Sequence, residues 1–322
     1  MSNDEPMTET CPSFFPYGLV PAVPTPFDAS GALRLDFIER QAMSLAELGV
    51  RTVFVAGTTG ECQSLSVEER ERLVERWCDV ARGAPLHVWA HVGHTVQEAA
   101  CRLARSARRC GAAAVAATAP FYHRPRTVED LVSFLQPIAE NADLPFYYYD
   151  IPHVTHVVFP LKCVIEEALK RLPRFAGVKY TNSDLIEFQR CVSFFGDRLA
   201  WMHGFDETLA AGILLGATGA VGSTYNVAYR FYRRIVNELE QGRWQQAARL
   251  QRQSVALVDL LDRHGLVPAL KAVLDQMGVP CGPPRPPLRP VPPETARQLY
   301  QQLQESGLLD KAEAFGGDGS LG

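Results

Sequence analysis

The sequence predicts an α/β protein, a (βα)8 TIM barrel with a C-terminal extension of three helices, from three observations. Short apolar runs of strand length alternate with amphipathic segments, eight such runs are present, and no Gly-x-Gly-x-x-Gly follows the first of them. Nearly continuous apolar strands that alternate with helices imply a parallel sheet covered by helices. Eight units favour a closed barrel over an open doubly wound sheet, whose dinucleotide fingerprint is missing here.

The eight predicted strands are short and mostly apolar, and the first seven are each followed by an amphipathic segment. In chain order they cover Tyr17–Pro24, Thr52–Ala56, Leu86–Val92, Ala113–Thr118, Pro145–Ile151, Phe175–Tyr180, Leu199–Gly204 and Gly219–Ser223.

Two of the helical segments carry a start signal. Ser66 with Glu69, and Thr127 with Asp130, have the spacing of a capping box, in which each side chain bonds to the other residue's backbone N–H. Apolar residues follow both signals at the spacing of one helical face. We therefore expect helices to begin at these two positions.

The pattern becomes purely helical after about residue 240. We expect flexible tails at 1–15 and 312–322, a barrel over 16–240 and a helical extension over 241–311, with helices at Trp244–His264, Pro268–Met277 and Pro293–Glu305. A proline-rich connector precedes the last helix, and it is either a stiff surface crossing or a polyproline ligand for a partner.

Composition excludes several classes of protein. The chain of 322 residues has 32 basic and 36 acidic side chains, a formal charge of −4, and 47% hydrophobic residues, which is enough to build a core rather than a disordered chain. No basic block suggests binding to nucleic acid, and glycines interrupt the longest apolar run, which is shorter than a membrane span. Eight scattered cysteines without a Cys-x-x-Cys pair favour a reduced, cytoplasmic protein without a thiolate metal site.

One lysine stands out among the five in the chain. Lys179 alone lies on an apolar predicted strand, where alternation puts it on the same face as Phe175 and Gly177. Burial inside a barrel would lower the pKa of the amine and supply the free nucleophile that a Schiff base requires. A lysine that reaches solvent or forms a salt bridge at the strand end is the alternative.

Two further positions lie at predicted strand ends, where barrel active sites are found. Tyr149 shares a face with Tyr147 and could exchange a proton with a substrate hydroxyl, although a core tyrosine is the commoner role. The Gly57-Thr-Thr-Gly-Glu turn offers the hydroxyls of Thr58 and Thr59 and backbone amides to a carboxylate. An ordinary strand-to-helix turn would have a similar sequence.

Two patterns resemble binding motifs without matching them. The glycine-rich segment 216–224 lacks the lysine of a phosphate-binding loop, because Gly222 precedes Ser223. The histidines at 87, 91 and 94 have neither the His-Glu-x-x-His spacing nor a zinc signature. We expect no metal site.

The motifs together resemble the superfamily of pyruvate-dependent class I aldolases that contains dihydrodipicolinate synthase and N-acetylneuraminate lyase. The resemblance covers roughly residues 17 to 310 and depends on the order of six motifs: Gly57-Thr-Thr-Gly-Glu, Phe146-Tyr-Tyr-Tyr-Asp-Ile-Pro, Phe175-Ala-Gly-Val-Lys, Gly204-Phe-Asp-Glu, Gly216-Ala-Thr-Gly-Ala-Val-Gly-Ser-Thr-Tyr-Asn and Gly282-Pro-Pro-Arg. It implies that Lys179 forms the Schiff base and that Tyr149 transfers protons. It also implies that Thr58 and Thr59 hold the substrate carboxylate, with Thr59 supporting Tyr149. The positions that match the family's sugar-binding residues are Thr181, Gly204, Asp206, Glu207 and Ser223.

The lyase branch fits better than the synthase branch. Synthases carry an arginine after the tyrosine turn for the second substrate's carboxylate, and Val154 stands at that place. Asp150 and His156 depart from the lyase pattern and could alter the accepted sugar; strand alternation should point Asp150 away from Tyr149. Tyr122 matches a tyrosine that related enzymes send into a neighbouring subunit.

The resemblance therefore implies reversible cleavage of N-acetylneuraminate (sialic acid) to N-acetylmannosamine and pyruvate, without a cofactor, by a cytoplasmic homotetramer. Its partners would be small-molecule substrates, not nucleic acid or membrane. Two alternatives remain: another pyruvate-forming aldolase or dehydratase of the same superfamily, and a barrel that binds a ligand without catalysis.

Overall fold

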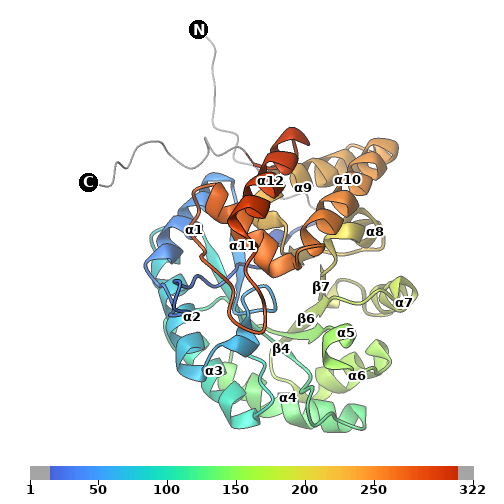
Figure 1. Cartoon of the computed structure of the whole chain (residues 1–322). Coiled ribbons are helices and arrows are strands. Elements are labelled where there is room, and N and C mark those ends of the chain that lie inside the picture. Colours follow the sequence, from blue (N-terminus) through green and yellow to red (C-terminus); the bar gives the residue numbers. More distant parts are fainter. Residues whose placement is uncertain (1–14, 311–322) are drawn as a thin grey trace.

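Eight parallel strands form the centre of the molecule in the computed structural model, which describes residues 15–310 (Figure 1). The strands pair in the order β1-β8-β7-β6-β5-β4-β3-β2, and a bridge between Ala22 and Phe54 joins the two ends. The sheet is therefore closed, and the predicted (βα)8 barrel is confirmed. Helices surround the strands, as the alternating pattern requires.

Every strand falls inside a run predicted from the sequence. The strands are β1 (Gly18–Pro21), β2 (Thr52–Val55), β3 (His87–His91), β4 (Ala114–Thr118), β5 (Phe146–Asp150), β6 (Phe175–Tyr180), β7 (Ala200–His203) and β8 (Gly219–Gly222). Each strand is four to six residues long.

The helices of the barrel follow the strands in sequence. They are α1 (Phe37–Glu47), α2 (Val67–Ala81), α3 (Gln97–Cys110), α4 (Val128–Ala142), α5 (Pro152–Thr155), α6 (Leu161–Arg171), α7 (Leu185–Phe195), α8 (Leu209–Leu214) and α9 (Tyr225–Glu240), with short 3₁₀ turns at η1 (Cys62–Ser64), η2 (Gly196–Arg198) and η3 (Asp206–Thr208). Both predicted capping boxes are present, at Ser66 before α2 and at Thr127 before α4.

The barrel interior is filled by aromatic and small side chains. Trp89 and Tyr147 stack at a ring distance of 4.6 Å, and Phe54 and Tyr149 meet edge to face at 6.0 Å. Gly177 allows β6 and β7 to approach closely, because a Cβ there would lie 2.1 Å from the Ala200 carbonyl oxygen. The interior between the strands is therefore a packed core and not a pore.

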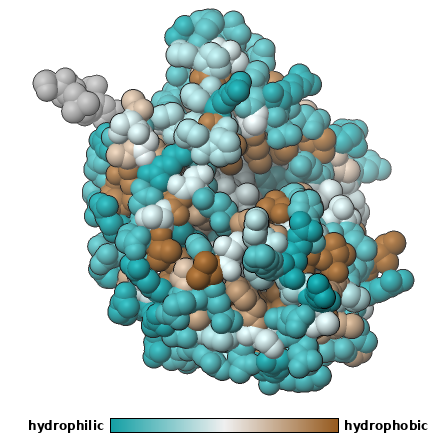
Figure 2. All heavy atoms as spheres, turned by 60° about the horizontal axis from the view of Figure 1, so that its bottom comes forward, coloured by the Kyte–Doolittle hydropathy of each residue, from teal (hydrophilic) through white to brown (hydrophobic). Residues whose placement is uncertain are grey.

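The predicted extension forms α10 (Trp244–Asp262), α11 (Leu266–Gln276) and α12 (Pro293–Glu305), which lie together on one side of the barrel (Figure 1). Of the predicted tails, residues 1–14 and 312–322 lie outside the described residues, whereas Phe15 is fully buried. Within residues 15–310, no helix is both long and apolar enough to cross a membrane. The face drawn in Figure 2 is largely hydrophilic, with apolar side chains in separate groups.

A buried ion pair links the extension to the turn after β2. Lys271 of α11 donates to Glu61 at 2.9 Å and to the carbonyl oxygens of Thr25 and Pro283, also at 2.9 Å. The side chains of Lys271 and Glu61 are each 1% exposed. The second Glu61 oxygen accepts from the Arg285 backbone at 2.8 Å, so the proline-rich connector is fastened to the same carboxylate.

We expect Lys271→Ala to lower the free energy of unfolding by about 3 to 5 kcal/mol, because it leaves the Glu61 carboxylate buried without its cation. Urea denaturation followed by circular dichroism measures this change. Lys170→Ala is the matched control, since Lys170 pairs with Glu167 on the surface and should hardly change the midpoint. Overlapping curves for the Lys271 variant and the parent would contradict the prediction.

Candidate active site

A cavity of about 170 Å³ opens at the carboxyl ends of the strands. All nine residues that the sequence singled out line it, which are Thr58, Thr59, Tyr149, Lys179, Thr181, Gly204, Asp206, Glu207 and Ser223. They come from the ends of five strands and meet because all strands of a parallel barrel point the same way.

The Lys179 amine lies at the base of this cavity. Its side chain is buried, and Nζ lies 3.5 Å from the centre of the Tyr149 ring and 3.1 Å from Thr181 Oγ1, to which it donates. Burial lowers the pKa of this amine well below its usual 10.5, and the Asp206 carboxylate only partly opposes that shift. The surroundings therefore favour an uncharged, nucleophilic amine.

Tyr149 is the strand neighbour of Lys179, at the register position directly opposite it on β5. Its hydroxyl lies 3.2 Å from Thr58 Oγ1. Burial raises the pKa of Tyr149 to about 12, and hydrogen bonds with Thr58 and Thr181 limit the rise. The phenol is thus neutral and hydrogen-bonded at the position where a substrate bound to the amine would lie.

The two threonines of the turn after β2 point to different strands, which corrects one expectation. Thr59 Oγ1 lies 2.6 Å from Ser223 Oγ, so Thr59 does not support Tyr149; Thr58 does. The turn begins with Ala56 in the left-handed region, at a φ of 57°, and within the turn Thr58 contacts β5 while Thr59 contacts the residue after β8. The expectation for Thr59 came from the resemblance to the family, and strand alternation does not extend to the threonines because β2 ends at Val55.

The Asp206-Glu207 pair begins the short 3₁₀ turn η3. Asp206 is buried and accepts from the Thr224 backbone at 3.0 Å and from Thr224 Oγ1 at 2.5 Å. Burial raises the pKa of both carboxyls, while the Thr224 hydrogen bonds oppose the rise at Asp206. Gly222 makes room for Asp206, because a Cβ there would lie 1.9 Å from Oδ1. Asp206 is therefore held by the next loop of the barrel.

The positions that depart from the lyase pattern lie outside the cavity lining. Asp150 points away from Tyr149, as alternation predicts, and accepts from Asn182 Nδ2 at 3.1 Å rather than pairing with His156. Burial raises the pKa of Asp150 to about 6. His156 is exposed and ends α5 at a φ of 52°, a conformation that glycine adopts more readily. Tyr122 is 78% exposed.

Sequence reasoning missed several residues that line the cavity. His153 and Phe205 stack on each other at a ring distance of 5.8 Å, and the extension contributes Val258, Leu266 and Val267. His153 could have been identified as a cavity residue because it follows the end of a strand closely. No local pattern pointed to the extension, because those residues reach the cavity through tertiary packing.

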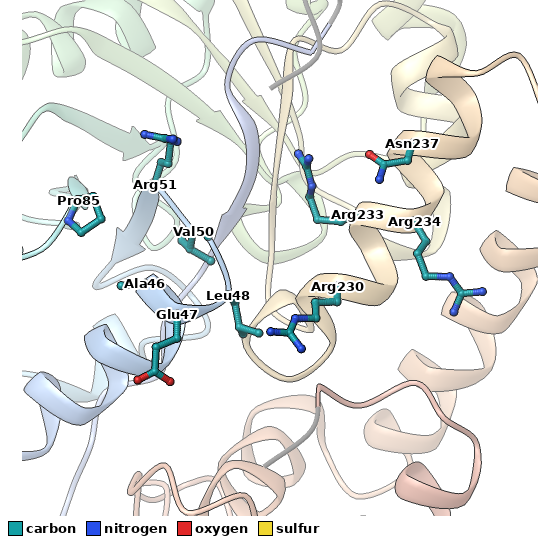
Figure 3. A pocket seen from close by; sticks show the side chains of 11 residues that line it. Ala46, Glu47, Leu48, Val50, Arg51, Pro85, Arg230, Arg233, Arg234 and Asn237 are labelled. Carbon is teal, nitrogen blue, oxygen red and sulfur yellow. The ribbon is translucent and has the colours of Figure 1, made fainter. Parts of the chain in front are cut away.

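A second cavity, of about 520 Å³, lies at the other end of the barrel (Figure 3). Arg51, just before β2, and three arginines of α9 line it together with Glu47. Figure 3 shows Arg230 extending toward Leu48, whereas Arg234 points away from it. None of the predicted site residues lies there. Within residues 15–310, no group of three His, Cys, Asp or Glu side chains is arranged to hold a metal ion.

A closed (βα)8 barrel with a desolvated lysine beside a tyrosine at the carboxyl ends of its strands defines a protein of the class I aldolase type. The model of the Dihydrodipicolinate synthetase family matches residues 16–306. The chain belongs to this family, and the resemblance that the motifs indicated is confirmed.

Several similar proteins are named N-acetylneuraminate lyase, and one similar structure is named DHDPS. N-acetylneuraminate lyases of Mus musculus and Homo sapiens are each 34% identical over 297 residues, which is 91% of this chain and 93% of theirs. The solved structure of Proteus mirabilis N-acetylneuraminate lyase superposes with a TM-score of 0.87 at 33% identity, covering 91% of this chain and 99% of that one. DHDPS from Cyanidioschyzon merolae, solved with lysine bound, gives 0.84 at 26% identity, covering 92% and 99%.

We expect Lys179→Met to raise the free energy of unfolding at pH 7, and the gain to shrink as the pH rises toward 10.5. The folded-state pKa of Lys179 is lowered, so between that value and 10.5 the unfolded chain binds a proton that the folded chain does not, which favours unfolding. The gap between variant and parent should close by up to about 1.4 kcal/mol per pH unit within this window. Urea midpoints at pH 7, 8 and 9 measure it. A gap that stays constant or widens with pH would show that the amine is charged in the folded protein.

Proposed function

We propose that this protein is an N-acetylneuraminate lyase that reversibly cleaves N-acetylneuraminate to N-acetylmannosamine and pyruvate. The observation that carries the proposal is the desolvated Lys179 amine against the Tyr149 ring, inside a cavity that also holds the two threonines and the Asp206-Glu207 pair. The names of the relatives and of the similar structures support the same activity.

Catalysis begins at the amine. Lys179 Nζ attacks the ketone carbon, C2, of the open-chain sugar, and loss of water gives an iminium that withdraws electrons. Tyr149, helped by the substrate's own carboxylate, removes the proton of the C4 hydroxyl. The C3–C4 bond then breaks, and its electrons form an enamine on the pyruvate carbons. Protonation of C3 and hydrolysis release pyruvate and restore the amine.

We assign the two ends of the substrate to two sets of side chains, which adjoin where Thr59 Oγ1 lies 2.6 Å from Ser223 Oγ. The Thr58 and Thr59 hydroxyls, with the amides of their turn, hold the carboxylate beside Tyr149. Thr181, Gly204, Asp206, Glu207 and Ser223 face the hydroxyl chain of the sugar. Adjacent carboxylates accept several hydrogen bonds from vicinal hydroxyls, which suits a polyol.

The iminium supplies the electron withdrawal, so the proposed reaction needs no cofactor. We place the enzyme in the cytoplasm, in agreement with its free cysteines, and we expect a homotetramer, as the resemblance implies. Val154 at the position of the synthase arginine favours the lyase over a reaction with a second carboxylate substrate.

Reduction with sodium borohydride in the presence of pyruvate tests the proposal. A lyase should gain the mass of the reduced pyruvate adduct on the Lys179 peptide and should lose it in Lys179→Ala. Steady-state turnover of N-acetyl- and N-glycolylneuraminate is then compared with a panel of keto-deoxy sugar acids. Faster turnover of the panel would favour another pyruvate aldolase or dehydratase, and the absence of any adduct would favour a non-catalytic barrel.

We expect Tyr149→Phe to lower kcat roughly 10²- to 10⁴-fold, the range for loss of a group that transfers a proton. Pyruvate should still be trapped on Lys179, because the phenol is not the nucleophile. Tyr147→Phe, one pleat further down the same face and stacked on Trp89, is the matched control and should keep near-parental turnover. Equal turnover in Tyr149→Phe and the parent would refute the proton-transfer role.

A further inference from the structure

Two cysteines lie against each other on the outer layer of the barrel, far apart in the sequence. Cys78 of α2 and Cys110, the last residue of α3, have their Sγ atoms 3.3 Å apart. Arg82, just after α2, donates to the Cys110 carbonyl oxygen at 3.4 Å, which holds the two helix ends together. The reaction described above uses neither thiol.

The two thiols differ in their access to solvent. Cys78 is buried, whereas Cys110 is partly exposed and lines a surface hollow whose charged residues are Arg72, Arg109, Glu68, Glu71 and Glu75. The contact with Cys78 lowers the pKa of Cys110 and raises that of Cys78. An oxidant from solvent therefore meets Cys110 first, with Cys78 within reach behind it.

We propose that Cys78 and Cys110 form a site of reversible oxidation, where a peroxide converts the two thiols into a disulfide between α2 and α3. The Cys110 thiolate attacks one oxygen of hydrogen peroxide, the O–O bond breaks, and a sulfenic acid and one water form. The Cys78 sulfur then attacks the sulfenic sulfur and displaces a second water. The thiols lose two electrons and the peroxide gains them.

The geometry allows this bond with a small movement. A disulfide has an S–S length of about 2.05 Å, so the sulfurs must approach by roughly 1.2 Å, which side-chain rotation and a slight shift of the helix ends can provide. A thiol reductant reverses the change by attacking the disulfide.

Peptide mapping tests the site directly, because trypsin separates the two cysteines. Cleavage after Arg76, Arg82, Arg109 and Arg126 leaves Cys78 in residues 77–82 and Cys110 in residues 110–126. The folded full chain is treated with hydrogen peroxide, alkylated in denaturant and digested without reductant. We expect a cross-linked pair of these two peptides, 2 Da lighter than their sum, which dithiothreitol separates.

The exposed Cys163 provides the control. In a Cys163→Ser background, titration of free thiols in denaturant should fall from seven to five on oxidation and return to seven with dithiothreitol. Cys78→Ser in that background should give no cross-link and should leave Cys110 as a sulfenic acid that dimedone labels. Recovery of both peptides fully alkylated after peroxide, or pairing of Cys110 with a different cysteine, would overturn the proposal.

A different observation, the stack of His153 on Phe205, carries a second inference, which rests on the proposed function. His153 follows β5, and Phe205 lies between the predicted sugar-binding residues Gly204 and Asp206. The rings stack at 28° and form one wall of the cavity. His153 is exposed, but the partial desolvation of its ring, and then the charge of Lys179, lower its pKa, which favours the neutral imidazole with one ring nitrogen as an acceptor.

We infer that His153 is a specificity-determining residue that contacts the polyol part of the substrate. Among the described residues, neither His153 nor Phe205 is a hydrogen-bond partner of the Lys179 amine or of the Thr58-Thr59 turn, so we expect this contact to select the sugar without affecting formation of the Schiff base. This assigns the role to His153 in place of Asp150 and His156, which the sequence suggested and which lie outside the cavity lining.

The test compares His153→Ala with His156→Gly, which is matched in position and suits the backbone conformation at residue 156. We expect His153→Ala to raise KM for N-acetylneuraminate at least fivefold and to change its ratio to the N-glycolyl sugar, with pyruvate trapping unchanged. His156→Gly should keep the parental values. Parental KM values and ratio in His153→Ala would refute this inference, whereas absence of trapping in the parent would refute the proposed function instead.

Discussion

The constraint on which the site depends is the burial of a single amine in the wall of a closed barrel. Lys179 is 5% exposed, and its Nζ is surrounded by the Tyr149 ring, the Phe54 ring and one hydroxyl. An ammonium loses most of its hydration there, which raises the free energy of the charged form. The neutral amine, which is the nucleophile, is therefore favoured. The barrel supplies this environment because β5 and β6 place the two side chains directly opposite each other.

The extension takes part in forming the site as well as covering it. Lys271 and the Arg285 backbone both bind the Glu61 carboxylate, and the Arg285 side chain bonds to Glu69 and to the Gly31 carbonyl oxygen. Glu61 itself has a φ of 53°, a strained conformation that persists only when its surroundings hold it. These contacts fix the turn that bears Thr58 and Thr59, so α11 and the connector stabilise the candidate carboxylate site from behind.

The strands, and the residues that lie on them or at their ends, could be predicted from the local periodicity of the sequence. Lys179 could be found because it is the one lysine on an apolar strand, and Tyr149 because the alternation of β5 carries it to the strand end. The partner of Thr59, which the resemblance implied, was predicted wrongly, because in this chain Thr58 bonds to Tyr149 and Thr59 bonds to Ser223. Contacts made by tertiary packing could not be predicted either: Cys78 and Cys110 are 32 positions apart, and His153 and Phe205 follow two different strands.

The same burial that activates the amine creates a difficulty later in the proposed reaction. Once Lys179 becomes an iminium, a positive charge is fixed covalently in the apolar interior and cannot be removed by deprotonation to an amine. The cavity must then supply negative charge, and it has two sources: the substrate carboxylate at the Thr58-Thr59 turn, and Asp206, whose field already acts on Lys179. Thr224 donates twice to Asp206 and favours its ionised form against the effect of burial. Because the substrate carboxylate adds its charge to that of Asp206, a 2-keto acid forms a better stabilised iminium than a ketone without a carboxylate, and this links the chemistry to the substrate class.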